Sequence, residues 1–294
     1  MSAISPARSA VRQDASPDAA TTPRAGVLQP AHHKPRPRPY PSRTGFPAVS
    51  VVVPARNEAR NLEIVLPAIS RVRPSVHEII VVDGHSTDDS IAAARAALPS
   101  ARVVTQTRRG KGNAMACGFA ATTGDVIVMF DADGSADPAE IPEFVSALVT
   151  GADFAKGSRF VPGGGSEDIT LLRKSGNAGL NGVANAFFGT AYTDLCYGYN
   201  AFWADLLPLL ELPAVDAAAD DDEMLWGDGF EIETVLNCRV AAAGLQIVEV
   251  PSMERRRIYG QSNLRTFADG ARVLRTLLAE RRRMGRRRAD AALR

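Results

Sequence analysis

The chain has 294 residues and a formal net charge of +1, with 34 basic against 33 acidic side chains. Its hydrophobic fraction of 45% is typical of a folded globular protein and excludes a fully disordered chain. No uncharged apolar run reaches about 18 residues, which excludes a membrane-spanning helix. Three widely spaced cysteines form neither a disulfide framework nor a zinc pattern, and they fit a reducing cytosol.

The charge is distributed unevenly along the chain. Residues 1–47 carry a net charge of +5 and residues 281–294 a net charge of +6, whereas residues 48–280 carry −10. Basic ends favour a polyanion or an anionic membrane surface as a partner, and solvated tails are the alternative interpretation. A nucleic-acid partner is not expected, because the body is acidic and shows no recognised binding motif.

The first 47 residues are predicted to be a disordered tail. They hold nine of the 19 prolines, including the alternation of Pro with Lys and Arg at residues 34–39. Such a segment has no periodic apolar face to bury. It also lacks the apolar run of a secretory signal.

Short β-branched runs alternate with segments of helical spacing from residue 49 to residue 130. This alternation predicts a mostly parallel sheet covered by helices on both faces, with a ligand site beyond the carboxyl ends of the strands. The predicted strands are 49–53, 78–82, 102–104 and 125–130, and the predicted helices are 57–70, 89–98 and 112–122.

Polar residues follow three of these strands. The third such tip places Asp131 and Asp133 on one turn, and Asp83 ends the second strand. Paired carboxylates are hard oxygen ligands, which suit Mg²⁺ or Mn²⁺ with substrate phosphates completing the coordination. An Asx-turn is the bland alternative for such an Asp pair.

A Gly-Lys-Gly turn at residues 110–112 precedes the helix predicted over 112–122. It has neither the spacing of a P-loop nor that of a dinucleotide-binding loop. It predicts a site where backbone N–H groups and the Lys111 ammonium meet a diphosphate, or else a solvated turn.

The motifs taken together resemble family 2 glycosyltransferases with the GT-A fold. Four motifs in the first half carry this resemblance, at residues 53–58, 81–88, 109–114 and 130–134. The second half is similar to the polyprenyl-phosphate members, the dolichol-phosphate mannosyltransferases and dolichyl-phosphate β-glucosyltransferases. Its motifs lie at residues 156–164, 176–177, 199–202, 229–233 and 257–262.

The resemblance covers about residues 49–264 and implies a single GT-A domain, an α/β fold with a mostly parallel sheet, over residues 48–263. It implies an inverting, metal-dependent enzyme that moves a hexose from a nucleotide sugar, of the UDP-glucose or GDP-mannose type, to a polyprenyl phosphate. The Asp-Ala-Asp-Gly sequence is closer to the glucosyltransferase branch and favours a UDP-sugar. Ser135 and Asn263 depart from the Gln and Lys that the family usually shows.

The resemblance also implies roles for individual residues. Asp131 and Asp133 would hold Mg²⁺ or Mn²⁺ and support catalysis, while Asp228, Glu231 and Glu233 are candidate bases for a hydroxyl acceptor. The implied donor-binding residues are Pro54, Arg56, Asn57, Glu58, Asp83, Lys111 and Asp131. The implied acceptor-binding residues are Ser158, Arg159, Arg257 and Ser262, since guanidinium groups suit phosphate oxygens.

Residues 264–283 are predicted to form an amphipathic helix, followed by a basic tail over 284–294. One interpretation docks the helix on the catalytic domain, and the other lays it in a membrane interface with its polybasic end on anionic lipid. The chain is expected in the cytoplasm, with a peripheral position on the inner face of the plasma membrane as the more specific form.

Two alternative activities remain open. One keeps the fold and replaces the lipid phosphate by a cell-wall or small-molecule hydroxyl. The other is a sugar-phosphate nucleotidyltransferase, which would need a glycine-rich basic loop directly after the first strand. Residues 54–58 hold no glycine at that place.

Overall fold

The computed structural model describes residues 43, 45–218, 224–260 and 266–292. Most of the predicted N-terminal tail, residues 1–42 and 44, therefore lies outside the described residues. Arg43 pairs with Asp153 at 2.6 Å and with Asp205 at 2.9 Å, and its guanidinium lies 4.9 Å from the centre of the Trp203 ring. Residue 43 is thus attached to the body of the protein, ahead of the predicted domain start at residue 48.

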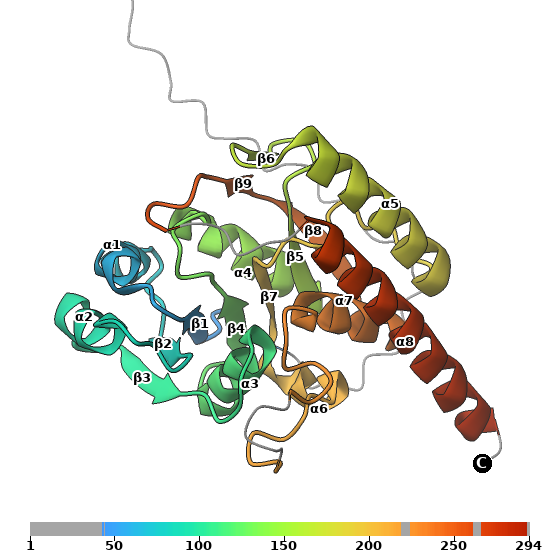
Figure 1. Ribbon diagram of the computed structural model, residues 1–294, viewed down its shortest axis with the longest axis horizontal. Helices are drawn as coiled ribbons and strands as arrows, with labels where there is room; N and C mark the ends of the chain where they lie inside the picture. The colour runs from blue at the N-terminus through green and yellow to red at the C-terminus, as the bar shows by residue number, and fades with distance from the viewer. Residues whose placement is uncertain (1–42, 44, 219–223, 261–265, 293–294) are drawn as a thin grey trace, which may run out of the picture.

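A seven-stranded sheet forms the centre of the molecule, in the order β3-β2-β1-β4-β7-β5-β8 (Figure 1). Strand β7 runs antiparallel to both of its neighbours and the remaining pairs are parallel, as the alternating pattern predicts. The strands are β1 Val49–Ala55, β2 Glu78–Asp83, β3 Arg102–Thr105, β4 Val126–Met129, β5 Phe154–Ser158, β7 Asn200–Trp203 and β8 Ile247–Pro251. A second, two-stranded sheet pairs β6 Gly165–Ser166 with β9 Met253–Glu254.

Strand β1 is the central strand of the parallel half. Its Val51 lies in register with Ile79 of β2 on one side and with Val128 of β4 on the other. Val51, Val52 and Val53 are fully buried, because helices cover both faces of this half of the sheet. A continuous β-branched run is what such a strand requires.

Helices α1, α2 and α3 follow the strands in the predicted order, and α4 to α7 were not predicted. The helices are α1 Ala59–Ser70, α2 Ser90–Ala97, α3 Lys111–Ala121, α4 Ile141–Val149, α5 Leu171–Phe188, α6 Leu207–Leu210, α7 Ile232–Ala242 and α8 Thr266–Ala292, with short 3₁₀ turns at Pro138–Glu140 and Ala204–Leu206. Helices α1 and α2 pack against each other beside β2 and β3, while α3 packs on β1 and β2. The chain reverses its direction across the sheet after β3, so right-handed crossovers put α3 on the face opposite to α1 and α2.

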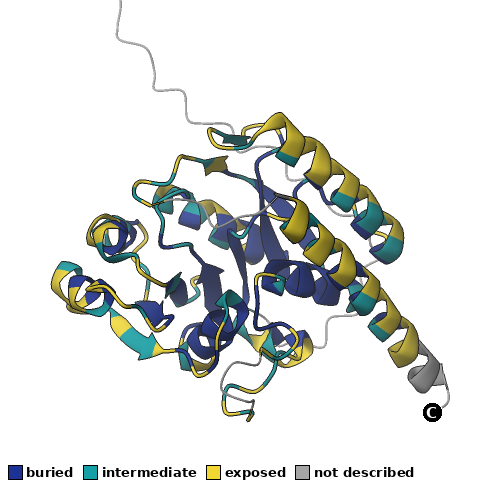
Figure 2. Cartoon of the chain, viewed as in Figure 1, coloured by how far each residue is buried: buried dark blue, intermediate teal, exposed yellow. Residues whose placement is uncertain are grey.

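Helix α8 packs against α5 and α7, and Figure 1 shows α5 and α8 side by side. Leu277 and Met284 are buried on its inner face, and Glu280 pairs with Arg239 of α7 at 3.0 Å. The outer face is exposed along most of the helix (Figure 2). The structure therefore supports the docked interpretation, and the helix continues past the predicted end at residue 283 to Ala292. Among the described residues, no helix is both long and apolar enough to cross a bilayer.

Close contact between α3 and the sheet depends on Gly118. A Cβ atom at this position would lie 2.2 Å from Val52 Cγ1 and 3.0 Å from Val82 Cγ2. We expect Gly118→Ala to lower the free energy of unfolding by about 1–3 kcal/mol, because the extra methyl overpacks this contact. Urea denaturation followed by circular dichroism measures the change.

Gly182→Ala is the matched control for this variant. Gly182 lies inside α5, and a Cβ atom there would meet nothing within 4 Å. It should raise stability by about 0.5–1 kcal/mol through helix propensity alone. Equal effects at the two positions would contradict the packing argument.

Candidate active site

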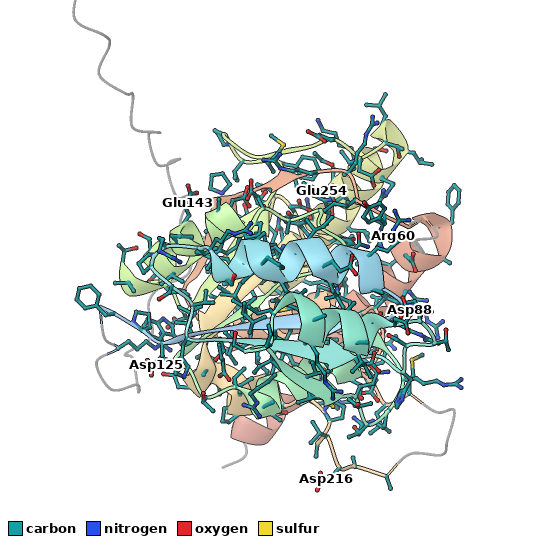
Figure 3. The ribbon with its side chains drawn as sticks, turned by 90° about the vertical axis from the view of Figure 1, so that its left-hand side faces the viewer. Arg60, Asp88, Asp125, Glu143, Asp216 and Glu254 are labelled. Atoms are coloured by element: carbon teal, nitrogen blue, oxygen red, sulfur yellow. The ribbon has the colours of Figure 1, made fainter. Side chains whose placement is uncertain are left out.

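The candidate site lies at the carboxyl ends of β1, β2 and β4. Figure 3 shows Asp88, which follows β2, and Asp125, which precedes β4, at opposite ends of the sheet. From β1 the chain runs through β2 to β3 on one side, and it then crosses back to β4 on the other side of β1. Such a reversal leaves a crevice beyond the strand ends, which is where open α/β sheets bind their ligands.

Hydrogen bonds tie the loop after β1 to the loop after β2. Asn57, with a φ of 58°, accepts from the Thr87 N–H at 2.8 Å, and its own N–H donates to Ser86 Oγ at 3.0 Å. Asp88 accepts from the N–H groups of Ala59 and Ser90, the first residues of α1 and α2. Backbone N–H groups at helix starts stabilise the carboxylate and hold the two loops together.

A cavity of about 320 Å³ opens beside these loops. Arg56 lines this cavity, and the side chain of Asp83 turns back to accept from the Ser86 N–H. Pro54, Asn57 and Glu58 are close to Arg56 in the sequence, but they do not line the cavity. The residues that line the cavity are Arg56, Gly84, His85, Thr107, Arg108 and Arg109.

Lys111 bridges two carboxylates at the centre of the site. Its Nζ lies 2.8 Å from Asp131 Oδ1 and 2.6 Å from Glu233 Oε1. Burial lowers the pKa of Lys111, but the two carboxylates outweigh burial and hold the pKa above its ordinary value. The ammonium is therefore charged at neutral pH, and it brings the tip of β4 together with the start of α7.

The glycines around Lys111 serve packing rather than a ligand. A Cβ at Gly112 would lie 1.8 Å from Gly227 O. The Gly112 N–H donates to Gly229 O at 3.2 Å, and the Asn113 N–H donates to Asp228 O at 3.1 Å. The prediction that the turn at residues 110–112 cradles a diphosphate is therefore wrong for the Gly112 N–H, because the loop over residues 227–229 occupies this group. The ammonium of Lys111 is what this turn offers to the crevice.

Arg257 bridges a second pair of carboxylates. Its Nη1 lies 2.8 Å from Glu58 Oε1, and its Nη2 lies 2.9 Å from Asp133 Oδ2. The other oxygen of Asp133 accepts from the Ser135 N–H at 2.9 Å. The two Asp residues of the pair are thus each matched with a cation, Asp131 with Lys111 and Asp133 with Arg257.

The predicted base candidates have distinct surroundings. Asp228 is fully buried and forms a two-pronged salt bridge with Arg108, at 2.8 and 3.0 Å, which raises the pKa of Arg108. Glu231 accepts from the N–H groups of Gly227 and Gly229. Of the three candidates, Glu233 is the one that shares a partner with Asp131.

Ser158 and Arg159 have partners that differ from those of Arg257. Ser158 Oγ lies 2.6 Å from Thr193 Oγ1. Arg159 contacts Asp194 through two nitrogens, at 2.7 and 2.9 Å, and Glu254 at 2.9 Å. Burial opposes its charge, but these carboxylates keep its pKa above the ordinary value. Ser262 lies outside the described residues.

A buried lysine, Lys156, fixes the backbone next to a residue that contacts Asp131. Lys156 is fully buried and donates to Tyr197 O at 2.6 Å and to Gly157 O at 3.0 Å, while burial lowers its pKa to about 8. Gly198 follows Tyr197 in the sequence and packs beside Asp131, where a Cβ atom would lie 3.3 Å from Asp131 Oδ2. Gly198 lies in the loop before β7, and nothing in the sequence around it predicts this contact.

The carboxylates of Asp131 and Asp133 are suitable ligands for a divalent cation. Both are oxygen donors on one turn, and no cluster of three or more acidic, His or Cys ligands occurs among the described residues. Mg²⁺ and Mn²⁺ commonly bind one or two carboxylates and take water and substrate phosphates as their remaining ligands. The two carboxylate ligands therefore fit a divalent cation that binds together with a diphosphate.

Comparison with known proteins gives this geometry a family. The model of glycosyl transferase family 2 matches residues 50–206, the segment that carries β1, β2, β4, Lys111 and the Asp131 and Asp133 pair. The chain belongs to glycosyl transferase family 2. The family resemblance and the GT-A fold expected from the motifs are thereby confirmed, and this family 2 enzyme is a hexosyltransferase.

Two curated relatives cover most of the chain. An undecaprenyl-phosphate mannosyltransferase of Micrococcus luteus is 34% identical over 74% of this chain and 87% of its own length. A polyprenol monophosphomannose synthase of Mycolicibacterium smegmatis is 31% identical over 73% of this chain and 80% of its own length.

A solved structure shares the fold of this family 2 enzyme. Glucosyl-3-phosphoglycerate synthase of Mycobacterium tuberculosis, in complex with Mn²⁺, UDP-glucose and phosphoglyceric acid, superimposes with a TM-score of 0.61. It is 27% identical, and the match covers 80% of each chain.

The buried salt bridge of Asp228 allows a structural role to be separated from a catalytic one. We expect Asp228→Asn to lower the free energy of unfolding by about 3–5 kcal/mol, because it leaves the buried Arg108 charge without a full partner. Thermal or urea denaturation measures this loss. If the variant keeps its stability and loses only turnover, the anchoring role is refuted and Asp228 acts in the reaction.

Proposed function

We propose that this enzyme transfers a hexose from a nucleotide sugar to a polyprenyl phosphate, with inversion at the sugar C1. The observation that carries the proposal is the pair of cation bridges at the tip of β4, Lys111 to Asp131 and Arg257 to Asp133. One cation faces the predicted donor side, and the other lies on the predicted acceptor side. The names of the two curated relatives support a polyprenyl phosphate as acceptor.

The residues supply the parts that such a transfer needs. The nucleoside would enter the cavity at Arg56, beside the loop that Asp83 holds through the Ser86 N–H. Lys111 would bind the diphosphate as a positive point charge. Asp131 and Asp133 would hold Mg²⁺ or Mn²⁺, which supplies charge neutralisation for the departing diphosphate. The Mn²⁺ of the solved relative supports this assignment.

The acceptor phosphate makes a general base unnecessary. An oxygen of the phosphate is already an anion, so it forms the new bond to C1 while the bond from C1 to the diphosphate breaks. The nucleoside diphosphate leaves with the electron pair, and no proton moves. This agrees with the surroundings of Asp228, Glu231 and Glu233, whose carboxylates are all engaged with other groups of the protein.

A hydroxyl acceptor remains the second candidate, favoured by the phosphoglyceric acid bound in the solved relative. That reaction would require a carboxylate to take the hydroxyl proton. Glu233 would be the group nearest to Asp131, but it would first have to leave Lys111.

A transfer assay tests the proposal directly. Radiolabelled UDP-glucose and GDP-mannose are each combined with Mn²⁺ and either a polyprenyl phosphate in detergent or phosphoglyceric acid. We expect label to move into the lipid product from one donor, and Asp131→Asn to lower kcat by about 100-fold or more through lost stabilisation of the leaving group. If label moves only into the soluble acceptor, the acceptor is a hydroxyl compound and the lipid assignment is refuted. Full activity in excess chelator would refute the requirement for a metal ion.

We also propose that this enzyme meets its acceptor on an anionic membrane surface. Leu171 and Phe267 lie 86% and 81% exposed near the N-terminal ends of the adjacent helices α5 and α8, and Leu172 is 55% exposed. Exposed arginines and a lysine, Lys174, Arg272, Arg275, Arg281 and Arg282, lie along the same two helices. Apolar side chains beside cations are typical of interfacial binding.

Vesicle flotation tests the membrane proposal. The full chain should float with vesicles that contain phosphatidylglycerol and should bind phosphatidylcholine vesicles much more weakly. Replacing Leu171, Leu172 and Phe267 by Ser should reduce binding about tenfold or more, since each buried apolar side chain contributes about 1.5 kcal/mol or more. Ile64→Ser, at an exposed position of α1, is the control. Equal loss in the control and the triple variant would refute this surface.

A further inference from the structure

Residues 255–259 form a clasp across the site, running from the tip of β4 to the start of α1. The Arg255 N–H donates to Ser135 O at 2.8 Å, and the Ile258 N–H donates to Asp133 O at 3.1 Å. At the far end, the Tyr259 N–H donates to Asn61 Oδ1 at 3.0 Å. The guanidinium of Arg60 lies 3.8 Å from the centre of the Tyr259 ring. The clasp is therefore fixed on both sides of Arg257.

The clasp holds the Arg257 guanidinium between two carboxylates. Nη1 contacts Glu58 at 2.8 Å and Nη2 contacts Asp133 Oδ2 at 2.9 Å, with 26% of the Arg257 side chain exposed. Asp133 Oδ1 already accepts from the Ser135 N–H. A metal ion bound to either oxygen of Asp133 would therefore lie close to the guanidinium of Arg257.

A divalent cation and Arg257 cannot both be bound closely by Asp133 without repulsion. Two positive charges on one carboxylate lie only a few ångströms apart, where Coulomb repulsion is strong in a partly buried site. A metal ion that binds this carboxylate therefore competes with the guanidinium, whatever the remaining ligands are.

The net charge of the site also favours competition between a metal ion and the resident cations. Asp131, Lys111 and Glu233 form one group of two carboxylates and one cation, and Asp133, Arg257 and Glu58 form another. With every side chain ionised, each group carries a net charge of −1. Together they attract a dication, while each carboxylate of the Asp pair already has a cation as its partner.

We propose that Arg257 is the resident counter-cation of Asp133, and that metal binding moves its guanidinium off Asp133 and makes it available to the acceptor phosphate. The second half of this inference rests on the proposed function. It sets an order of binding, in which the donor and its metal ion precede the acceptor phosphate. Because coupling between two ligands is reciprocal, the acceptor phosphate must also strengthen the binding of the metal ion.

Binding of Mn²⁺ alone tests the first half. Free Mn²⁺ is measured by electron paramagnetic resonance during titration of the wild-type chain, Arg257→Gln and Arg255→Gln. We expect Arg257→Gln to bind Mn²⁺ at least about fivefold more tightly, the lower limit of ordinary coupling between sites. Arg257→Lys keeps a positive charge and should lie between the wild type and Arg257→Gln.

Arg255→Gln is the matched control, because it removes the same charge from the same clasp. Arg255 pairs with Asp137 at 2.9 Å and does not contact Asp133, so its removal should leave the affinity for Mn²⁺ near that of the wild type. Circular dichroism and the midpoint of thermal unfolding establish that each variant is folded. Unchanged or weaker Mn²⁺ binding by folded Arg257→Gln and Arg257→Lys would overturn the inference.

A short isoprenyl phosphate tests the second half, with its binding measured calorimetrically in the absence and presence of saturating Mn²⁺. For the wild type we expect Mn²⁺ to tighten binding at least about fivefold, and for Arg257→Gln we expect no such gain. Equal gains in both chains would overturn the transfer of Arg257 to the acceptor.

The two tests separate this inference from the proposed function. Tighter Mn²⁺ binding by Arg257→Gln supports the counter-cation role even where no isoprenyl phosphate binds. That combination would overturn the lipid-phosphate acceptor and the transfer of Arg257 to it. Conversely, sugar transfer to lipid with unaltered Mn²⁺ binding in Arg257→Gln would keep the function and refute the inference.

Discussion

The placement of two carboxylates at the carboxyl end of β4, each paired with a cation from elsewhere in the chain, is the interaction on which this site depends. Asp131 and Asp133 leave the strand on one turn, and they would repel each other and any diphosphate if left unpaired. Lys111 neutralises Asp131 from the start of α3, and Arg257 neutralises Asp133 from the clasp. The distant segments that build the crevice are thereby joined through charge.

Support for these pairs comes from a buried salt bridge beside the crevice. The salt bridge between Arg108 and Asp228 fixes the loop over residues 227–229, and this loop receives the N–H groups of Gly112 and Asn113. Lys111 therefore projects from a turn that is closed on its other side. The exchange of a cation at the site then requires the movement of side chains rather than of the loops that carry them. Such preorganisation is how enzymes reduce the reorganisation needed when charge develops.

Much of the fold could be predicted because its signals are local. The β-branched run at residues 49–53 and the helical spacing over 57–70 each describe one element, and the structure confirms them as β1 and α1. The Asp pair was identified for the same reason, since a polar turn directly after a buried strand is visible in the sequence. The antiparallel position of β7 between β4 and β5 was not predicted, because it depends on pairing between residues far apart in the chain.

The sequence by itself determined the order of strands and helices over residues 49–130, the family motifs and the residue types available at the strand ends, because each depends on neighbouring residues. Only the tertiary structure decided which charges meet. Lys111 pairs with Asp131 and Glu233. Arg159 pairs with Asp194 and Glu254. Asp228 pairs with Arg108. All of these partners are separated by many residues. The sequence around a charged side chain does not indicate which opposite charge it will meet in the folded protein. The free energy of pairing depends on distance and burial, and these are set only when the strands and helices pack together.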